Sequence, residues 1–443
     1  MSPATLVERD RSTAPPSGRA NRSWWSAAAI GAWILAIAIV YLWGRWLQAR
    51  GHRLFINLPP LVGHLDPRLA WQGVGALALA PAAVVWGPRV AERMGWRRLL
   101  WVAFAAAAAW ALALALTEGV GGVLRSPSSP RDYLHDAPLI GSPLGFLSTY
   151  VDRIAAYSTH VRAHPPGMAL VAWSLWRFGG GPAWLAGLEI ASAASAVPAV
   201  LLALRELAGE PRARAAAPFL AFAPAAITAG SSGDAFFAGV GSWAVALLVL
   251  STGRTGRRRD ALALEGGVLF GATVFLSYGL VLLAAIPLTT AAWRRRWRPM
   301  LLAVVGALPL FVAFLAAGFW WVDGLNVTRA EYAESVARLR PYSYFVVANL
   351  VAFSVVLGPA GVAALPRLRG RAAPSVLIGG ALVAVLVADL SGMSKAEVER
   401  IWLPFVPWLL LATAWLPRAS RRGWLAANVA FGLMLELAVR QPW

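Results

Sequence analysis

Cysteine is absent from the 443-residue sequence, so the chain forms no disulfide bond, has no thiolate nucleophile and offers no thiolate ligand to a metal. Lysine is almost absent: Lys395 is the only one, although Lys and Arg together number 40. Charged residues make up only 14% of the chain and hydrophobic residues 58%, with a mean hydropathy of +0.60. A soluble protein of this length carries more charge than this, so the composition excludes an ordinary soluble class.

Long apolar runs take the place of the missing charge. Many segments extend for roughly 15–23 residues with almost no charge, enough helix to cross a hydrocarbon core of about 30 Å. They are continuously apolar rather than alternating, which excludes a β-barrel. The sequence therefore predicts an all-α fold, a polytopic transmembrane helical bundle of roughly 13–15 helices. Helices are expected near residues 25–45, 69–87, 98–117, 165–178, 182–208, 215–231, 235–252, 261–293, 299–320, 342–364, 375–391, 402–417 and 424–440.

Two of these segments do not fit a single crossing. Residues 261–293 are too long for one simple pass and are Arg-rich at both ends, which predicts two short helices that meet near Ser277-Tyr278-Gly279. The same argument predicts that residues 182–208 divide into two short helices near Pro198. No internal repeat is evident, which counts against transporter folds built from two related halves.

Positive charge is concentrated in short loops between the apolar runs. The net charge is +19, and segments such as "GRTGRRRD" and "WRRRWRP" carry much of it. This pattern places the Arg-rich loops on the cytoplasmic side, with the N-terminus, and accounts for the charge through anionic lipid rather than nucleic acid. The polar residues 1–23 are expected to be a disordered cytoplasmic tail. The outer side then receives residues 46–68, 118–164, 231–235, 277–279, 321–341 and 392–401.

Acidic and basic side chains gather in these outer loops. The longest loop, 118–164, contains a stretch at 144–162 that could form an amphipathic helix on the membrane surface. The sole lysine of an Arg-rich chain, Lys395, suggests a place where a compact ammonium group matters. Candidate site residues across the loops are Asp132, Tyr133, Asp136, Arg162, His164, Asp234, Tyr278, Lys395, Glu399 and Arg400.

Each candidate also has a purely structural interpretation. Asp132 and Asp136 are typical of loop or capping residues, and Asp234 is suited to cap the helix that follows it. The 392–401 loop is also consistent with a solvated turn that carries local ion pairs. The two prolines of His164-Pro165-Pro166-Gly167 suit the first turn of a helix, which explains the prolines but not His164 or Arg162. What favours a functional interpretation is that the acids, the bases and the one lysine share one predicted side.

The order of these motifs resembles a known superfamily. Asp132 follows the third predicted helix, an amphipathic stretch comes next, and "HVRAHPPG" opens the following helix. "DYLHD", "PFLAFAPAAI" followed by "SSGDAFF", "FLSYGL" and "SKAEVERIWLPFVPW" complete the series. In this order the chain resembles the GT-C superfamily of polyprenyl-phosphate-sugar-dependent glycosyltransferases, and within it the protein mannosyltransferase and aminoarabinose transferase branch. It also resembles actinobacterial integral membrane proteins of this type, over roughly residues 98–417.

The resemblance implies a domain organisation and a departure from the pattern. Residues 98–417 would form the catalytic core, preceded by two extra helices in 24–97 and followed by a C-terminal helix in 418–443. In this branch the first outer loop carries a catalytic acid, often as Asp-Glu. This sequence has Arg131-Asp132-Tyr133 instead, which leaves Asp132 and Asp136 as competitors for that role.

The resemblance also implies a reaction, at the outer face of a bacterial cytoplasmic membrane. A sugar such as mannose or a pentose like arabinose would pass, with inversion, from a polyprenyl-phosphate donor to a cell-envelope glycan or glycolipid. Asp132 or Asp136 would deprotonate the acceptor hydroxyl. Lys395 and Arg400, with Arg162 or His164, would stabilise the departing phosphate. Tyr133, Asp234, Tyr278 and Glu399 are further site candidates, and no cofactor, metal ligand set or nucleotide sugar is implied.

Two other classes of function stay open at the level of sequence. A multi-pass transporter or lipid flippase for envelope precursors would need polar residues in mid-membrane and would form no glycosidic bond. A non-catalytic membrane scaffold would tolerate alanine at Asp132, Asp136 and Lys395 alike.

Overall fold

The computed structural model describes residues 17–67, 71–230, 232–369 and 372–441. Of the predicted disordered tail, residues 1–16 lie outside this described part, and helix α1 begins at Ser17. The all-α fold is confirmed. The only strands among the described residues are β1 (His64–Leu65) and β2 (Val439–Arg440), which pair antiparallel.

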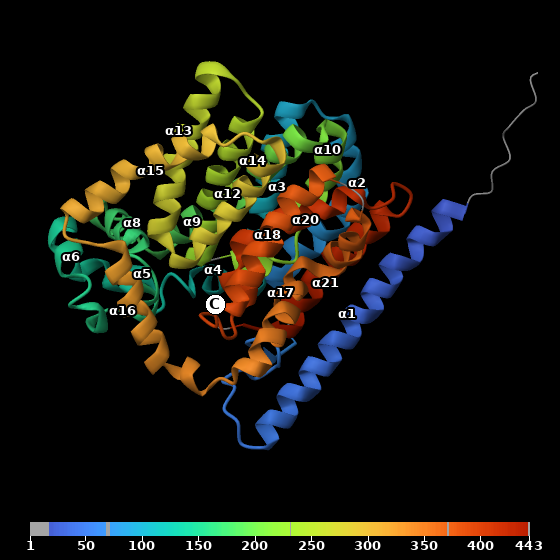
Figure 1. Ribbon diagram of the computed structural model, residues 1–443. Coiled ribbons are helices and arrows are strands. Elements are labelled where there is room, and N and C mark those ends of the chain that lie inside the picture. The colour runs from blue at the N-terminus through green and yellow to red at the C-terminus, as the bar shows by residue number, and fades with distance from the viewer. Residues whose placement is uncertain (1–16, 68–70, 231, 370–371, 442–443) are drawn as a thin grey trace, which may run out of the picture.

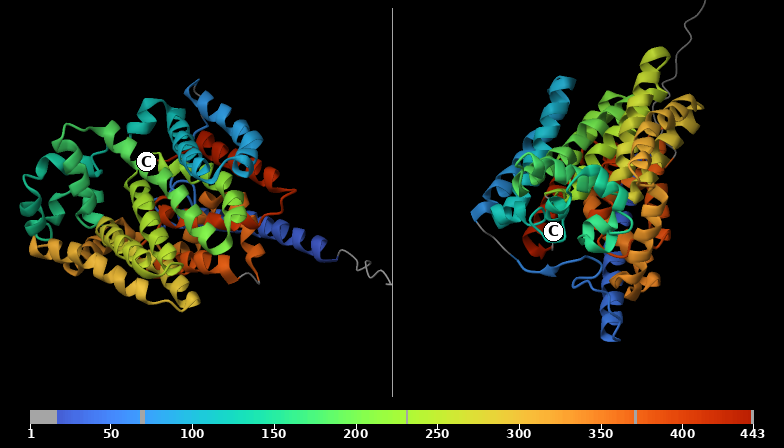
Figure 2. Two further views of the ribbon diagram at one scale, coloured as in Figure 1. Left: turned by 90° about the horizontal axis from the view of Figure 1, so that it is seen from above. Right: turned by 90° about the vertical axis from the view of Figure 1, so that its left-hand side faces the viewer.

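The first half of the chain contains several long helices and a long loop made of short helices. They are α1 (Ser17–Ala49), α2 (Val74–Arg93), α3 (Trp96–Ala115), α4 (Val120–Leu124), α5 (Tyr133–Asp136), α6 (Pro143–Thr149), α7 (Thr159–Ala163), α8 (Gly167–Arg177), α9 (Pro182–Ala208), α10 (Glu210–Ala221) and α11 (Ala226–Ala229). In Figure 1 the segment from α5 to α8 lies on one side of the bundle and α1 on the opposite side, and the left view of Figure 2 agrees.

The second half supplies the other long helices. They are α12 (Gly233–Thr252), α13 (Gly256–Leu276), α14 (Ala285–Arg294), α15 (Arg298–Ala316), α16 (Trp321–Glu334), α17 (Tyr342–Ala364), α18 (Ala372–Leu390), α19 (Val398–Ile401), α20 (Val406–Leu410) and α21 (Arg421–Ala438). Seven helices in the described part are long and apolar enough to cross a membrane, and three shorter apolar helices accompany them. The protein is a multi-pass membrane protein, and the total of roughly 13–15 crossings stays a prediction.

The two predicted helix breaks have different outcomes. The break at Ser277 is confirmed, because α13 ends at Leu276 and a 3-10 turn, Tyr278–Ala284, leads into α14. The break at Pro198 is wrong, because α9 continues through this proline for 27 residues. A proline inside a helix removes one main-chain hydrogen bond. Here Pro198 is buried where α9 packs against α3, α10 and α12, and that packing keeps the helix continuous.

Two predicted loops contain more helix, or a different helix, than the sequence indicated. The stretch 144–162 is helical, but in three short pieces, α6, the 3-10 turn Ile154–Ala156 and α7, rather than in one amphipathic helix. The loop expected at 321–341 consists largely of α16. The prediction that Pro165 and Pro166 start a helix is confirmed, because Pro166 is the N-cap residue of α8.

Polar loops and Arg-rich loops occupy opposite ends of the bundle. At one end Arg162 meets Glu331, Arg400 meets Asp234, and β1 pairs with β2. At the other end Glu206 of α9 binds both Arg254 and Arg294. Arg214 donates there to the main-chain oxygens of Ala91 and Met94, and Arg418 pairs with Glu92. The Arg-rich loops that the sequence places on one side therefore meet at one end of the bundle.

Helices α9 and α12 pack closely where they leave the polar end. The Ser192 hydroxyl donates to the main-chain oxygen of Phe236, and the Trp243 indole donates to the Ser195 hydroxyl. Residue numbers rise together in the two contacts, so the helices run parallel. Gly239 faces Ser192 so closely that a Cβ at position 239 would overlap the main-chain oxygen and the hydroxyl of Ser192. Glycine is required at this crossing for steric reasons.

This crossing generates a stability prediction. Gly239→Ala should lower the free energy of unfolding by about 1–3 kcal/mol, because the added methyl group forces the two helices apart. Thermal unfolding of the detergent-solubilised protein measures the effect. Gly187→Ala is the matched control, since Gly187 lies in α9 and a Cβ added there would meet no atom within 4 Å. That control should be neutral or stabilising by up to about 1 kcal/mol, and equal midpoints for both variants would contradict the close packing.

Candidate functional site

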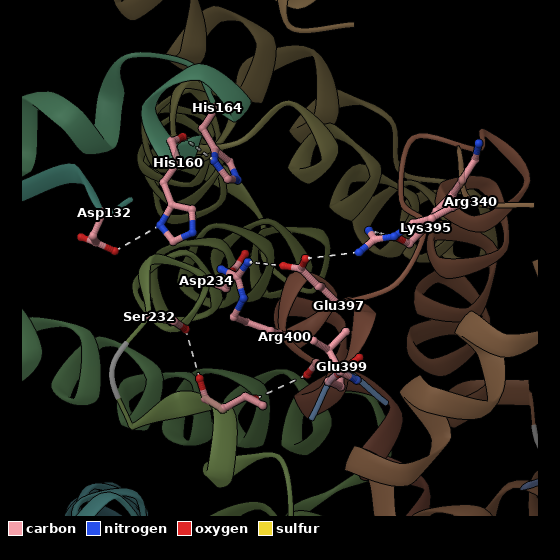
Figure 3. A network of polar contacts seen from close by, with 12 residues as sticks. Asp132, His160, His164, Ser232, Asp234, Arg340, Lys395, Glu397, Glu399 and Arg400 are labelled. Carbon is pink, nitrogen blue, oxygen red and sulfur yellow. Dashed lines mark hydrogen bonds and ion pairs between the residues drawn. The ribbon is translucent and has the colours of Figure 1, made fainter. Parts of the chain in front are cut away.

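Asp132 lies at the start of α5 with its carboxylate fully buried. The main-chain oxygen of Arg131 accepts from the His160 N–H at 3.0 Å, which holds the start of α5 against α7. The Asp132 Oδ2 atom accepts from His160 Nδ1 at 3.2 Å (Figure 3). Its other oxygen, Oδ1, is buried and has no hydrogen-bond partner among the described residues. One oxygen of Asp132 is thus held in position, while the other has no hydrogen-bond partner among the described residues.

Tyr133 and His164 form a neutral pair beside this carboxylate. The Tyr133 hydroxyl lies 2.9 Å from His164 Nδ1, which is also 3.0 Å from the main-chain oxygen of His160. Burial, followed by the charges of Asp234 and Asp132, raises the pKa of Tyr133 well above its usual range. Burial lowers the pKa of His164 to about 4. Near neutral pH His164 therefore offers hydrogen bonds rather than the positive charge that the sequence suggested.

Asp136 has a structural partner. Its Oδ2 atom accepts from the main-chain N–H of Ser158 at 2.7 Å, and Ser158 is the N-cap residue of α7. The contact joins α5 to α7 across the loop. A carboxylate that accepts a main-chain N–H in this way fixes the loop geometry.

Arg400 stands at the centre of a buried charge network. Its Nη1 atom donates to Asp234 Oδ2 at 2.7 Å, and its Nη2 atom donates to Glu397 Oε2 at 3.1 Å. Burial alone lowers the pKa of Arg400, but Asp234 and Glu397 raise it above its usual range. For Glu397 the effects are reversed. Burial raises its pKa, but the charges of Arg400 and Arg340 more than offset burial and hold the pKa below its usual value. Arg400 is therefore a buried cation that lies between two carboxyl groups.

The backbone before α19 is strained where it carries this network. Ala396 and Glu397 have φ values of 73° and 63°, in the left-handed region that L-residues avoid at roughly 1–2 kcal/mol each. Asn349 of α17 supports the turn. Its Oδ1 atom accepts from the Ala396 N–H at 3.1 Å, and its Nδ2 atom donates to the Ser394 main-chain oxygen at 2.8 Å. Strain of this kind persists where surrounding contacts fix the backbone, and it is concentrated at functional sites.

Lys395 and Arg340 extend the polar region away from Asp132. Arg340 donates to the Lys395 main-chain oxygen and lies 4.0 Å from Glu397. Lys395 Nζ donates to the main-chain oxygen of Ala337 at 3.1 Å. Figure 3 shows Lys395 beside Arg340, with the Arg400 group between them and Asp132. The lysine thus links two loops, and no contact joins it directly to Asp132 among the described residues.

The remaining candidates lie around the edge of this network. Glu399 is fully buried; its Oε1 atom accepts from the Val62 N–H at 3.1 Å. Burial raises the pKa of Glu399 to about 7. Arg162 pairs with Glu331 of α16 at 3.2 Å. Tyr278 packs its ring against Trp321 at a centroid distance of 5.2 Å.

Five of the ten predicted site residues therefore form one buried cluster, which the structure completes with three others. The predicted residues are Asp132, Tyr133, His164, Asp234 and Arg400, and the additional ones are His160, Glu397 and Glu189. Two of these additional residues have a recognisable sequence pattern. His160 precedes His164 by one helical turn, and Glu189 is a single acid within an apolar run.

No group of three or more His, Asp or Glu side chains in the described part of the chain is arranged to hold a metal ion. The cluster is instead a set of charges and hydrogen bonds among protein groups. It contains a carboxyl group with one unbonded oxygen, Asp132, and a guanidinium group, Arg400, at the polar end of a membrane bundle. This arrangement suits proton abstraction from a hydroxyl beside a site for a developing negative charge.

Comparison with known proteins gives a distant structural likeness. A scan against protein-family models finds no match, and a search of curated proteins finds none either. Among solved structures, the oligosaccharyltransferase of Archaeoglobus fulgidus, crystallised with Zn and sulfate, aligns at 14% identity and a TM-score of 0.41. The alignment covers 76% of this chain and 51% of that one, so this chain spans about half the length of the protein it matches.

The raised pKa of Glu399 predicts a pH-dependent stability. The folded state keeps the proton to about pH 7, while the unfolded chain loses it near the ordinary value of 4.5. The unfolded state therefore binds fewer protons between these values, and stability falls as the pH rises through them. Glu399→Gln keeps the acceptor for the Val62 N–H and removes the titration. Its stability gain over the wild type should grow between pH 5 and pH 8, by about 2–3 kcal/mol at most.

Thermal unfolding in detergent at several pH values measures this difference. Glu92→Gln serves as the control, because Glu92 lies 46% exposed at the opposite end of the bundle. The pH dependence of the Glu399→Gln difference is compared with that of this surface substitution. A Glu399→Gln difference that does not exceed the control between pH 5 and pH 8 would show that Glu399 is ionised in the folded protein at pH 5.

Proposed function

We propose that this protein is a membrane glycosyltransferase of the GT-C type, which moves a sugar from a polyprenyl-phosphate donor to a hydroxyl acceptor. The observation that carries the proposal is the environment of Asp132. Its carboxylate is buried, one oxygen is held by His160, and the other has no partner among the described residues. A general base needs an oriented oxygen that can receive the proton of a substrate. The order of the sequence motifs from "DYLHD" to "SKAEVERIWLPFVPW" supports the assignment to this superfamily.

Asp132 is favoured over Asp136 as the base. The two carboxylates lie about one helical turn apart, so both face the same loop. Asp136 is bound to the Ser158 N–H, which gives it a structural task, whereas the open oxygen belongs to Asp132. His160 orients the base, and Tyr133 with the neutral His164 borders it.

The proposed reaction is a single displacement with inversion. Asp132 takes the proton of the acceptor hydroxyl as that oxygen attacks the anomeric carbon of the donor. The bond between this carbon and the phosphate oxygen breaks, and the lipid phosphate leaves with the electron pair. Arg400 is the cation of the central network and would stabilise that charge, with Arg162 and Lys395 as cations at the edge. Asp234 and Glu397 position Arg400, and Tyr278 and Glu399 line the surroundings.

The finer assignments follow from the resemblance. The transferred sugar would be mannose or a pentose such as arabinose, and the acceptor a cell-envelope glycan or glycolipid. The reaction would occur on the outer face of a bacterial cytoplasmic membrane, with the lipid-linked donor entering from the bilayer. The separation of Arg-rich loops from the polar end supports this orientation.

A transporter or lipid flippase for envelope precursors is the alternative function. The buried Glu189 within α9 favours it, because such a protein needs a polar group inside a membrane span. Against it, the other charged groups of the cluster lie at the start of α5, at the start of α12 and in α19, at one end of the bundle. Formation of a new glycosidic bond distinguishes the two functions.

The base assignment gives a direct prediction. Asp132→Asn keeps the size of the side chain and removes its basicity, so turnover should fall by about 10²-fold or more while donor binding survives. Release of polyprenyl phosphate from a lipid-linked sugar measures turnover in reconstituted protein.

Asp136→Asn is the matched control for this change. The asparagine oxygen can still accept the Ser158 N–H, so the variant should keep most of the activity. An inactive Asp136→Asn beside an active Asp132→Asn would reverse the two roles. Full activity of both variants would remove the base from this loop.

The orientation of the bundle gives a second prediction, which the cysteine-free chain makes clean to test. Ser128 is exposed at the polar end and Thr255 is exposed in an Arg-rich loop at the other end. In intact cells Ser128→Cys should react with a membrane-impermeant thiol reagent, and Thr255→Cys should react only after permeabilisation. The opposite labelling pattern would place the site on the cytoplasmic side and contradict the proposed donor.

A further inference from the structure

Glu189 is a buried acid that the proposed reaction does not yet use. It lies two turns into α9, is fully buried, and neither carboxylate oxygen has a hydrogen-bond partner among the described residues. Most buried polar side chains in proteins are hydrogen-bonded, so a carboxyl group with both oxygens unbonded requires an explanation. Its neighbour Ser192, one turn on, is fixed against Phe236 of α12, so the helix surface that carries Glu189 cannot turn outward.

The charges around Glu189 are mostly of its own sign. Among them Asp132 has the strongest influence, followed by Asp234, and Arg400 is the opposing charge. The guanidinium group of Arg400 already binds Asp234 and Glu397. An ionised Glu189 would therefore be a buried charge among like charges with no cation of its own, which costs several kcal/mol.

A protonated carboxyl group avoids this cost and changes what Glu189 can bind. In the uncharged form one oxygen donates a hydrogen bond and the other accepts one. Asp132, the charged group with the strongest influence on Glu189, also has an unbonded buried oxygen, Oδ1. Asp132 and Glu189 thus bring unbonded oxygens to the same polar cluster. A hydroxyl group can both donate and accept a hydrogen bond, so it can bind to either acid. A cation bound there would instead favour the ionised form of Glu189.

We infer that Glu189 is an uncharged carboxylic acid in the resting protein, and that it binds hydroxyl groups of the transferred sugar beside Asp132. The sugar-binding part of this inference rests on the proposed glycosyl transfer, whereas the protonation state does not. Glu189 takes no proton from the acceptor and gives none to the leaving phosphate. It holds the sugar while Asp132 removes the acceptor proton.

Infrared difference spectroscopy tests the protonation state without any substrate. The carbonyl stretch of a protonated carboxylic acid is absent from an ionised carboxylate. The wild-type-minus-Glu189→Gln spectrum near neutral pH should therefore contain this band. Glu92→Gln is the control: Glu92 is paired with Arg418 and 46% exposed, so its difference spectrum should lack the band. Absence of the band for Glu189 as well would overturn the inference.

Kinetics test the role at the sugar. Glu189→Gln keeps one donor and one acceptor without charge, so kcat/KM should stay within about 3-fold of the wild type. Glu189→Ala removes both hydrogen bonds and should lower kcat/KM by about 10- to 100-fold. Unfolding midpoints of both variants identify any loss that is due to misfolding.

The possible outcomes distinguish the two parts of the inference, which are the protonation state of Glu189 and its binding of the sugar. A glutamine variant as impaired as the alanine variant, with a normal unfolding midpoint, would show that the carboxylate charge is needed. An alanine variant as active as the wild type would remove Glu189 from sugar binding. If the wild type transfers no sugar at all, the proposed function fails, and the infrared band still decides the protonation state.

Discussion

The buried ion pair between Asp234 and Arg400 is the interaction on which the site depends. It joins α12 to α19 across 166 residues of sequence, and Glu397 completes it. One guanidinium group binds two carboxyl groups. Removal of Arg400 would leave the buried Asp234 without its partner, a change that typically costs about 3–5 kcal/mol, whereas Glu397 would keep Arg340 at 4.0 Å. The pair also brings the strained turn at Ala396 and Glu397 beside the loop that carries Asp132. This contact therefore fixes α19 against the start of α12 at the polar end of the bundle.

Around this pair, cations bind protein groups, whereas several acid oxygens have no hydrogen-bond partner among the described residues. Three cations near the site bind protein groups: Arg400 binds Asp234 and Glu397, Arg162 binds Glu331, and Lys395 binds the Ala337 main-chain oxygen. The buried acid oxygens without a hydrogen-bond partner among the described residues include Asp132 Oδ1, both oxygens of Glu189, and Glu399 Oε2. In the proposed reaction a donor phosphate competes with a carboxylate for Arg400 or Arg162, and with a main-chain oxygen for Lys395. A hydroxyl group can instead donate to an acid oxygen that has no partner among the described residues. Neutral Tyr133 and His164 lie beside Asp132 without adding charge.

The sequence predicts helix positions and helix breaks that depend on neighbouring residues in the chain. Helix α17 occupies the predicted range 342–364, and the break before Tyr278 follows from Arg-rich flanks that must return to one side. The continuity of α9 through Pro198 could not be predicted, since it depends on neighbours that pack along the helix. The same holds for the choice between Asp132 and Asp136. They lie on one turn, and only the fold reveals that Ser158 meets Asp136. The partner of Arg400 and the isolation of Glu189 likewise arise from contacts between distant segments.

The central claim is that this site breaks the bond between a sugar and a polyprenyl phosphate. The most direct test incubates purified protein, reconstituted in lipid, with a panel of polyprenyl-phosphate sugars and an acceptor extract of the cell envelope. Mass spectrometry of the lipid fraction then follows each donor. The account predicts that at least one donor is converted to free polyprenyl phosphate while its sugar appears in the acceptor fraction, and that Asp132→Asn abolishes both changes. Movement of an intact donor across the bilayer without loss of its sugar would contradict the account and identify a lipid transporter.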